Sequence, residues 1–181
     1  MIAPLPKQLL SRPFVVTALP DSGLRTTLDA DETERDALAK AYGLIAVKSL
    51  KAEFLVKPHK GAVHVTGSVH GIVTQTCTVS LDPFDADVIE QVDLVFMQQA
   101  GIDAWIAKNK AKQKEEPTLE DEDPPDAIVD GRIDLGEVAA EFLALGIDPY
   151  PRKPGVEFDA GPTSDKDPSP FAALAQLKKD K

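Results

Sequence analysis

Residues 61–84 read Gly-Ala-Val-His-Val-Thr-Gly-Ser-Val-His-Gly-Ile-Val-Thr-Gln-Thr-Cys-Thr-Val-Ser-Leu-Asp-Pro-Phe, and this stretch decides the fold. Most odd positions from 63 to 81 carry apolar side chains, whereas most even positions carry histidine, threonine or serine. A repeat of two residues is typical of a β-strand with one face on a core and the other toward solvent or a partner. Cys77, Val79 and Leu81 share the apolar parity, so we expect all three side chains on the core face.

The predicted strand is longer than most, and Gly67 and Gly71 lie where a bend or bulge would let it curl. Asp82 and Pro83 predict a turn, because proline presets the dihedral angle that a tight turn requires. The alternation then resumes and continues to Phe96. The sequence therefore predicts a long curved hairpin at the centre of an antiparallel sheet.

Shorter periodic segments flank this hairpin. Residues 14–17 and 24–28 predict two early strands that pair with each other, and residues 47–57 predict a third strand before the centre. Helices are predicted at 31–43 and 134–145, each with an aspartate at its start and a glycine at or just after its end. The fold class is therefore α+β, with a curved antiparallel β-sheet or partly closed barrel that these two helices cover.

The sequence predicts that the chain divides into four parts. We expect residues 1–106 to form a β-rich core with one helix, and residues 107–125 to form a disordered charged linker, because that run has few apolar side chains to bury. Residues 126–158 complete the same domain with the buried helix and a proline-rich strip. Residues 159–181 form a flexible tail, which ends in a short helix with Phe171, Leu174 and Leu177 on one side.

The bulk composition favours a protein partner over a nucleic acid. Lys and Arg total 20 against 30 Asp and Glu, which gives a formal net charge of -10. Non-specific nucleic-acid binding depends on clustered cations, so an acidic chain suits a protein partner, a basic one included. A single cysteine excludes an intramolecular disulfide and fits a reducing compartment. With no secretory signal and no bilayer-spanning run, we expect a soluble cytoplasmic protein without a membrane partner.

Two blocks of sequence carry a family resemblance. In residues 76–84, the pattern Cys-x-x-Cys-Leu-x-Pro is matched except that Ser80 stands where the second cysteine would be. The second block comprises residues 130–135 and continues at 148–155. Over most of residues 10–158, the chain resembles the YceD-like large ribosomal RNA accumulation proteins. The motif residues are Cys77, Leu81, Asp82, Pro83, Asp130, Gly131, Arg132, Asp134 and Leu135.

The resemblance implies a non-catalytic factor that supports accumulation of large-subunit ribosomal RNA and hence ribosome biogenesis. The acidic charge favours action through a ribosomal or ribosome-assembly protein rather than a coating of RNA. Arg152 and Lys153 form a local basic pair that could still touch phosphate.

Residues with catalytic or metal-binding chemistry are few. His64 and His70 share a strand face but stand roughly 20 Å apart on a straight strand, too far for one metal ion. Cys77 lacks a second cysteine partner and is interpreted as a small packed hydrophobe. No phosphate-binding glycine loop, nucleophile elbow or zinc-protease motif is present, so we expect no catalysis, no metal and no cofactor. The alternative is a small zinc-binding regulator or metal-dependent enzyme that uses Cys77 and the histidines.

The best candidate for partner binding is a proline-rich strip that follows the second predicted helix. Such a strip is stiff and loses little entropy on binding, and Tyr and Arg are common interface anchors. Its residues are Asp148, Pro149, Tyr150, Pro151, Arg152 and Lys153. The other interpretation is that the strip wraps its own domain and Tyr150 fills a crevice. The C-terminal helix is too short to be stable alone, so it either docks on its own domain or binds a partner.

Overall fold

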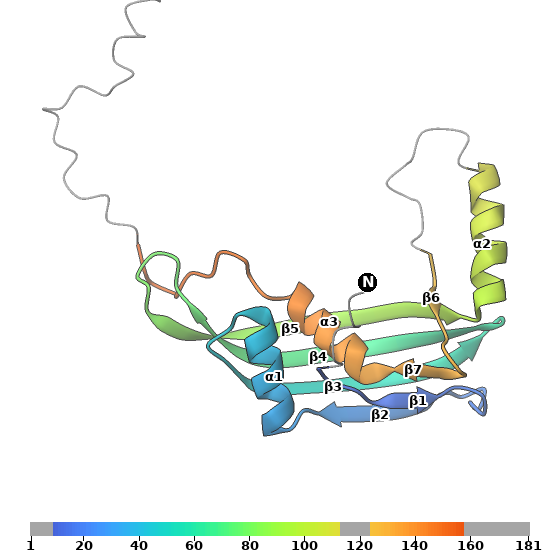
Figure 1. The fold of residues 1–181 in the computed structure, drawn as a ribbon, viewed down its shortest axis with the longest axis horizontal. Coiled ribbons are helices and arrows are strands. Elements are labelled where there is room, and N and C mark those ends of the chain that lie inside the picture. The colour runs from blue at the N-terminus through green and yellow to red at the C-terminus, as the bar shows by residue number, and fades with distance from the viewer. Residues whose placement is uncertain (1–8, 113–123, 158–181) are drawn as a thin grey trace, which may run out of the picture.

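Three long antiparallel strands form the centre of the molecule (Figure 1). The computed structural model describes residues 9–112 and 124–157. Strands β3 (Ala46–His59), β4 (Ala62–Thr76) and β5 (Pro83–Met97) pair in chain order. Buried valines alternate along β4, because every second side chain points to the core face. The predicted central hairpin, formed by β4 and β5, is confirmed.

In the described part of the chain, the main sheet has five strands and open edges. Strand β2 (Leu24–Asp29) pairs with β3, and the two-residue strand β6 (Asp126–Ala127) adds to β5 in parallel. The order is β2-β3-β4-β5-β6, and the sheet does not close into a barrel. The α+β class is confirmed, while one short parallel pair departs from the antiparallel prediction. The pairing of β4 runs without a bulge through both of its glycines, and the bulge lies instead at 47–49 of β3.

The first strand pairs differently from the prediction. Strand β1 (Pro13–Val15) pairs with β7 (Arg132–Asp134) in a separate two-stranded sheet, not with β2. Phe14 lies opposite Ile133 in this pair and packs against the core. A local turn made the hairpin with β2 plausible, but β2 instead pairs along its full length with β3.

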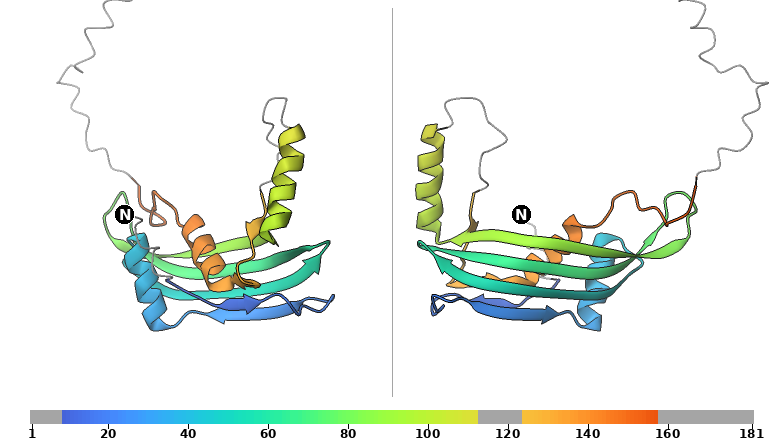
Figure 2. Two further views of the ribbon diagram at one scale, coloured as in Figure 1. Left: turned by 45° about the vertical axis from the view of Figure 1, so that its right-hand side comes forward. Right: turned by 180° about the vertical axis from the view of Figure 1, so that it is seen from behind.

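Two helices cover one face of the sheet (Figure 2). Helix α1 (Glu32–Tyr42) begins with the predicted capping box of Asp31 and Glu34 and ends at Gly43 in the left-handed conformation. Helix α3 (Leu135–Leu145) buries most of its apolar side chains. It packs closely because Gly71 has no side chain: a Cβ there would lie 2.5 Å from Leu143 Cδ1. Both predicted helices are confirmed.

The third helix replaces part of the predicted linker. Helix α2 (Gln99–Lys112) stands at the end of the sheet, anchored by the buried Ile102 (Figure 1). The prediction of disorder is wrong for residues 107–112, because Lys and Ala are good helix formers and extend the anchored turn. The remaining linker residues 113–123 lie outside the described residues, as do 158–181 with Phe171, Leu174 and Leu177. No helix in the described ranges is long and apolar enough to cross a membrane.

Strand β4 ends five residues earlier than predicted. Residues 77–82 form a loop closed by two backbone bonds, from Cys77 N to Asp82 O and from Leu81 N to Cys77 O. Leu81 has a φ of 61° and is 74% exposed, so its predicted place on the core face is wrong. Cys77 is buried as predicted, and it continues the buried odd positions Val73 and Gln75 one residue beyond the end of β4.

Candidate functional site

The proline-rich strip, residues 148–153, is bonded to the 77–82 loop and the end of β4. Gln75 Nε2 donates to Asp148 O at 3.0 Å. Both the amide and the hydroxyl of Thr78 donate to Pro151 O, at 2.8 and 3.1 Å. The structure therefore joins two sequence blocks that stand about seventy residues apart, and it fixes the strip by bonds to its backbone.

Cys77 is the centre of this junction. Its Sγ accepts from the amides of Val79, Ser80 and Lys153, each at 3.4 Å. The Ser80 amide, the Lys153 amide and the Ser80 side chain stabilise the thiolate and lower the pKa of Cys77 to about 6, although burial opposes this. Ser80, at the place of the second motif cysteine, thus donates a hydrogen bond to the Cys77 sulfur. The enclosed thiol holds loop and strip together.

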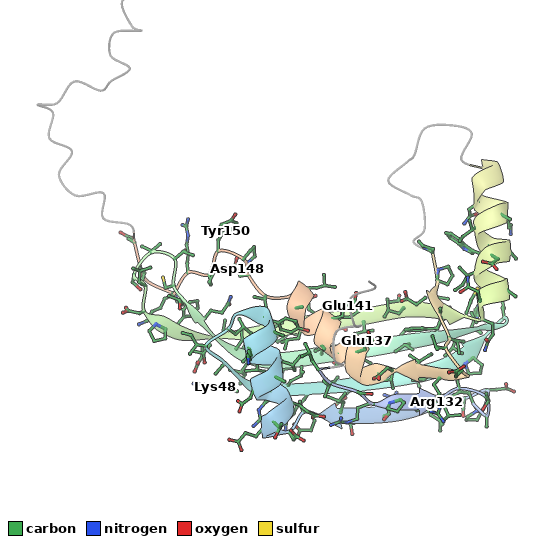
Figure 3. All side chains as sticks on the ribbon, in the orientation of Figure 1. Lys48, Arg132, Glu137, Glu141, Asp148 and Tyr150 are labelled. Carbon is green, nitrogen blue, oxygen red and sulfur yellow. The ribbon has the colours of Figure 1, made fainter. Side chains whose placement is uncertain are left out.

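The side chains of the strip face outward. Tyr150 is 74% exposed and projects from the strip, so the alternative in which it fills a crevice is wrong (Figure 3). Asp148 Oδ1 accepts from the Tyr150 amide at 2.8 Å and so fixes the backbone beneath this ring. Pro151 is buried, whereas Arg152 and Lys153 are exposed. The strip does wrap the domain with its backbone, and it presents its side chains to solvent.

The first part of the second motif block lies at the opposite end of the molecule. Figure 3 shows Arg132 there, far from Tyr150. Asp130 and Gly131 both have positive φ and form the turn before β7. Asp134 accepts from the hydroxyl of Ser11 at 2.6 Å and caps α3 through the amides of residues 136 and 137. These roles, with the burial of Leu135, position the helix and the N-terminal segment.

The histidines do not join Cys77 in a site. His59 and His64 face each other across the β3–β4 turn with ring centroids 5.0 Å apart. His70 Nε2 lies 3.2 Å from an Asp87 carboxylate oxygen. Within the described residues, no three His, Cys, Asp or Glu side chains are arranged to hold a metal ion. The zinc-site alternative therefore gains no support from the geometry.

Sequence reasoning missed a groove toward the end opposite the strip. Its walls include Glu137 and Glu141 of α3 together with Leu94 and Phe96 of β5. No single segment carries a signal for it, because four separate segments meet there. The available signal was the pair of outward-facing glutamates in a helix whose other positions are nearly all apolar, which could have indicated a charged surface on α3.

Comparison with known proteins assigns the chain to a family. The family model described as large ribosomal RNA subunit accumulation protein YceD matches residues 65–178. This range contains the 77–82 loop, α3 and the strip. Neither the curated proteins nor the solved structures contain a significant match. The chain therefore belongs to the YceD family of large ribosomal RNA subunit accumulation proteins.

Proposed function

We propose that this protein is a non-catalytic factor that supports accumulation of large-subunit ribosomal RNA by binding a ribosomal or ribosome-assembly protein. The family description supports the role in RNA accumulation. The contact that we assign to the partner is the strip, residues 148–153. Its bonded position on the 77–82 loop, which carries the other family motif, supports this choice.

One observation carries the proposal: Tyr150 is exposed on a backbone that is held in place. A partner that covers this ring would gain apolar contact without the entropic cost of ordering a loop. Leu81, exposed on the adjoining loop, offers a second apolar side chain. An exposed aromatic beside an arginine is a common centre of binding energy in protein interfaces.

The charge of the chain favours a protein as the direct partner. A formal net charge of -10 opposes a coating of RNA, whereas Arg152 and Lys153 permit local contact with phosphate. We assign a second contact to the C-terminal segment with Phe171, Leu174 and Leu177, which lies outside the described residues. Two modest contacts joined by the spacer at 159–167 would gain from effective concentration.

The test is the double variant Tyr150→Ala with Arg152→Glu. It should fold normally, because neither side chain is buried or bonded within the described residues. In cells depleted of the wild-type protein, the variant should capture less partner and restore less mature large-subunit RNA. The control, Ile89→Ala with Arg25→Glu, also truncates one exposed large side chain and reverses one exposed arginine charge, but on the sheet, and it should restore RNA fully.

Two outcomes would contradict the proposal at different levels. If the double variant folds and restores large-subunit RNA completely, the strip is only a structural wrap. If complete loss of the protein leaves the ribosomal subunit profile unchanged, the role in RNA accumulation itself fails.

A further inference from the structure

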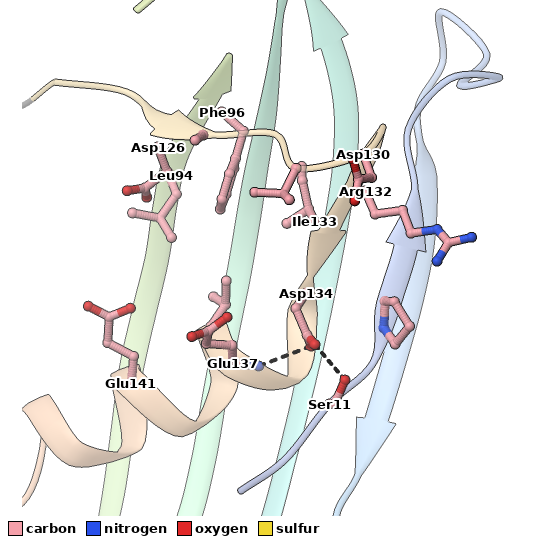
Figure 4. A pocket seen from close by; sticks show the side chains of 14 residues that line it. Ser11, Leu94, Phe96, Asp126, Asp130, Arg132, Ile133, Asp134, Glu137 and Glu141 are labelled. Carbon is pink, nitrogen blue, oxygen red and sulfur yellow. Dashed lines mark hydrogen bonds between the residues drawn. The ribbon is translucent and has the colours of Figure 1, made fainter. Parts of the chain in front are cut away.

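A groove of about 590 Å³ extends from Glu137 and Glu141, near the middle of the molecule, toward Arg132 at the end opposite the strip (Figure 3), and Figure 4 shows its lining. Its walls come from the N-terminal segment around Ser11, the end of β5, the 126–134 segment and the outer face of α3. Four apolar side chains, which we call its floor, belong to its lining; Leu94 is partly exposed, and Phe96, Ile133 and Val138 are nearly fully buried. An apolar hollow of this kind is able to seat an aliphatic side chain of another polypeptide.

Carboxylates surround this floor. Asp126 stands on one side of Leu94, and Glu137 and Glu141 stand on the other, all three exposed (Figure 4). Arg132 is the cation in the lining, and its guanidinium points away from the hollow in Figure 4. Asp134 is occupied as the N-cap of α3. The field inside the groove is therefore negative.

Within the described residues, these three carboxylates form no ion pairs, whereas several others on the surface do. Ion pairs within the described residues join Arg12 to Glu34, Lys48 to Asp85 and Lys51 to Asp29. None of the ion pairs in the same ranges involves Asp126, Glu137 or Glu141. Nor do they form a cluster that could hold a metal ion. Separated carboxylates around an apolar floor match an extended cationic chain better than a single ion.

The protein's own segments fit the groove poorly. The stretch 113–123 continues from the helix beside β6, but it carries six acidic residues against one lysine and would be repelled. The C-terminal stretch starts beyond the strip, at the opposite end of β5. Strand β5 covers roughly 43 Å from Pro83 to Phe96, and residues 158–170 reach at most about 43–47 Å when fully extended, so Phe171 would reach the groove only with this spacer almost straight. A second copy carries the same charge of -10 and is disfavoured for that reason.

We propose that this groove binds a basic segment of a partner protein, rich in lysine or arginine, with one aliphatic residue seated on Leu94 and Phe96. The cations of that segment face Glu137 and Glu141 on one side and Asp126 on the other. This inference goes beyond the strip, which lies at the other end of the molecule. It also holds if the strip has no partner.

The probe is a fluorescent twelve-residue peptide of alternating lysine and arginine with one central leucine. The full chain should bind this peptide, and the affinity should fall as salt is raised from 50 to 300 mM, because exposed charges are screened. Glu137→Gln with Glu141→Gln should weaken binding about tenfold, as expected for two exposed charge pairs. The matched control, Glu53→Gln with Asp93→Asn, removes two exposed carboxylates from the sheet strands and should bind as the wild type does.

The apolar floor has its own test. Leu94→Ala should weaken binding of the leucine peptide about threefold and should not change binding of a matched peptide with glycine in place of leucine. Thermal unfolding of each variant checks that a loss of affinity does not reflect a loss of fold.

Several results would overturn the inference. They are failure of the wild-type protein to bind the peptide and equal weakening by the two double variants. Loss of peptide binding in Tyr150→Ala with Arg152→Glu would also overturn it, because the site would then be the strip. If that strip variant binds the peptide normally and restores large-subunit RNA fully, the strip proposal is contradicted and the groove proposal is supported.

Discussion

The two ends of β5 present different kinds of surface. At the start of β5, hydrogen bonds with the 77–82 loop hold the backbone of the strip. Tyr150 of the strip is exposed, while Cys77 and Pro151 are buried. At the end of β5, the groove has an apolar floor and exposed carboxylates without ion-pair partners in the described ranges. Recognition at the strip should therefore depend on shape and change little with salt. Recognition at the groove should depend on charge and weaken with salt.

Helix α3 connects these two ends. Its outer face supplies Glu137 and Glu141 to the groove, and its C-terminus leads through Gly146 into the strip. The buried side of the helix is docked on β4 and β5, and the helix thereby positions both surfaces. A variant within α3 should therefore affect both surfaces, whereas a variant at either end should affect one.

The largest effect is expected from Leu143→Ala, which should destabilise α3, the helix that both surfaces share. Leu143 is fully buried and packs over Gly71. Loss of its side chain should lower the free energy of unfolding by about 2–5 kcal/mol, from lost burial and the cavity left behind. Urea denaturation measures this change. Both partner capture and peptide binding should weaken at urea concentrations close to the midpoint at which the variant unfolds.

The control for this variant is Leu145→Ala in the same helix. Leu145 is 69% exposed, so its loss should change the unfolding free energy by less than about 0.5 kcal/mol. Equal stability of the two variants would show that α3 is not docked through Leu143.

A smaller effect, confined to one end, is expected from Asp134→Ala. Its carboxylate caps α3 and holds Ser11 and the Arg12 amide at the groove end. The variant should lose about 1–2 kcal/mol of unfolding free energy. Amide hydrogen exchange should accelerate at Gly136 and Glu137, while the Thr78 amide at the strip end should exchange as before.

Asp134→Asn is the matched variant, because an asparagine oxygen still caps a helix. It should retain most of the lost stability. Faster exchange at Thr78 in Asp134→Ala would mean that the two ends are not separable.

Below pH 6, the smallest effect is expected from Cys77→Ala, at the strip end. Below pH 6, the variant should lose about 1 kcal/mol from the missing side-chain volume. The folded thiol has a pKa of about 6, below its ordinary value of 9.0, so the native state loses this proton at a lower pH than the unfolded chain does. Stability from the thiolate is fully present above pH 9 and is lost as pH falls toward 6. The difference in melting temperature between wild type and variant should therefore widen from pH 5.5 to pH 8.5.

Lys153→Gln distinguishes the contribution of the Lys153 backbone amide from that of its side chain. The Lys153 amide donates to Cys77 Sγ, whereas its ammonium lies 4.0 Å from Asp82 in an exposed pair. This variant should change the unfolding free energy by less than about 0.5 kcal/mol and keep the wild-type pH dependence. A wild-type advantage over Cys77→Ala that stays constant with pH would show that the buried thiol is not ionised.

The sequence by itself determined the elements whose signals are local. Alternation along β4 and β5 specified the central hairpin, because side chains of a strand alternate between two faces. Asp31 with Glu34, and Asp134 with the apolar positions after it, specified where α1 and α3 begin. The two motif blocks also identified the family, and the model match confirms it.

Only the tertiary structure decided which distant segments meet. The apolar parity continues from Cys77 to Leu81, yet the chain turns there, and the Thr78 and Lys153 amides form bonds with the strip and the thiol. Strand β1 pairs with β7 more than a hundred residues away, and the groove needs four segments to form. Periodicity and capping act over a few residues. Hydrogen bonds between remote segments depend on closing the chain between them, and no local pattern encodes which closure prevails.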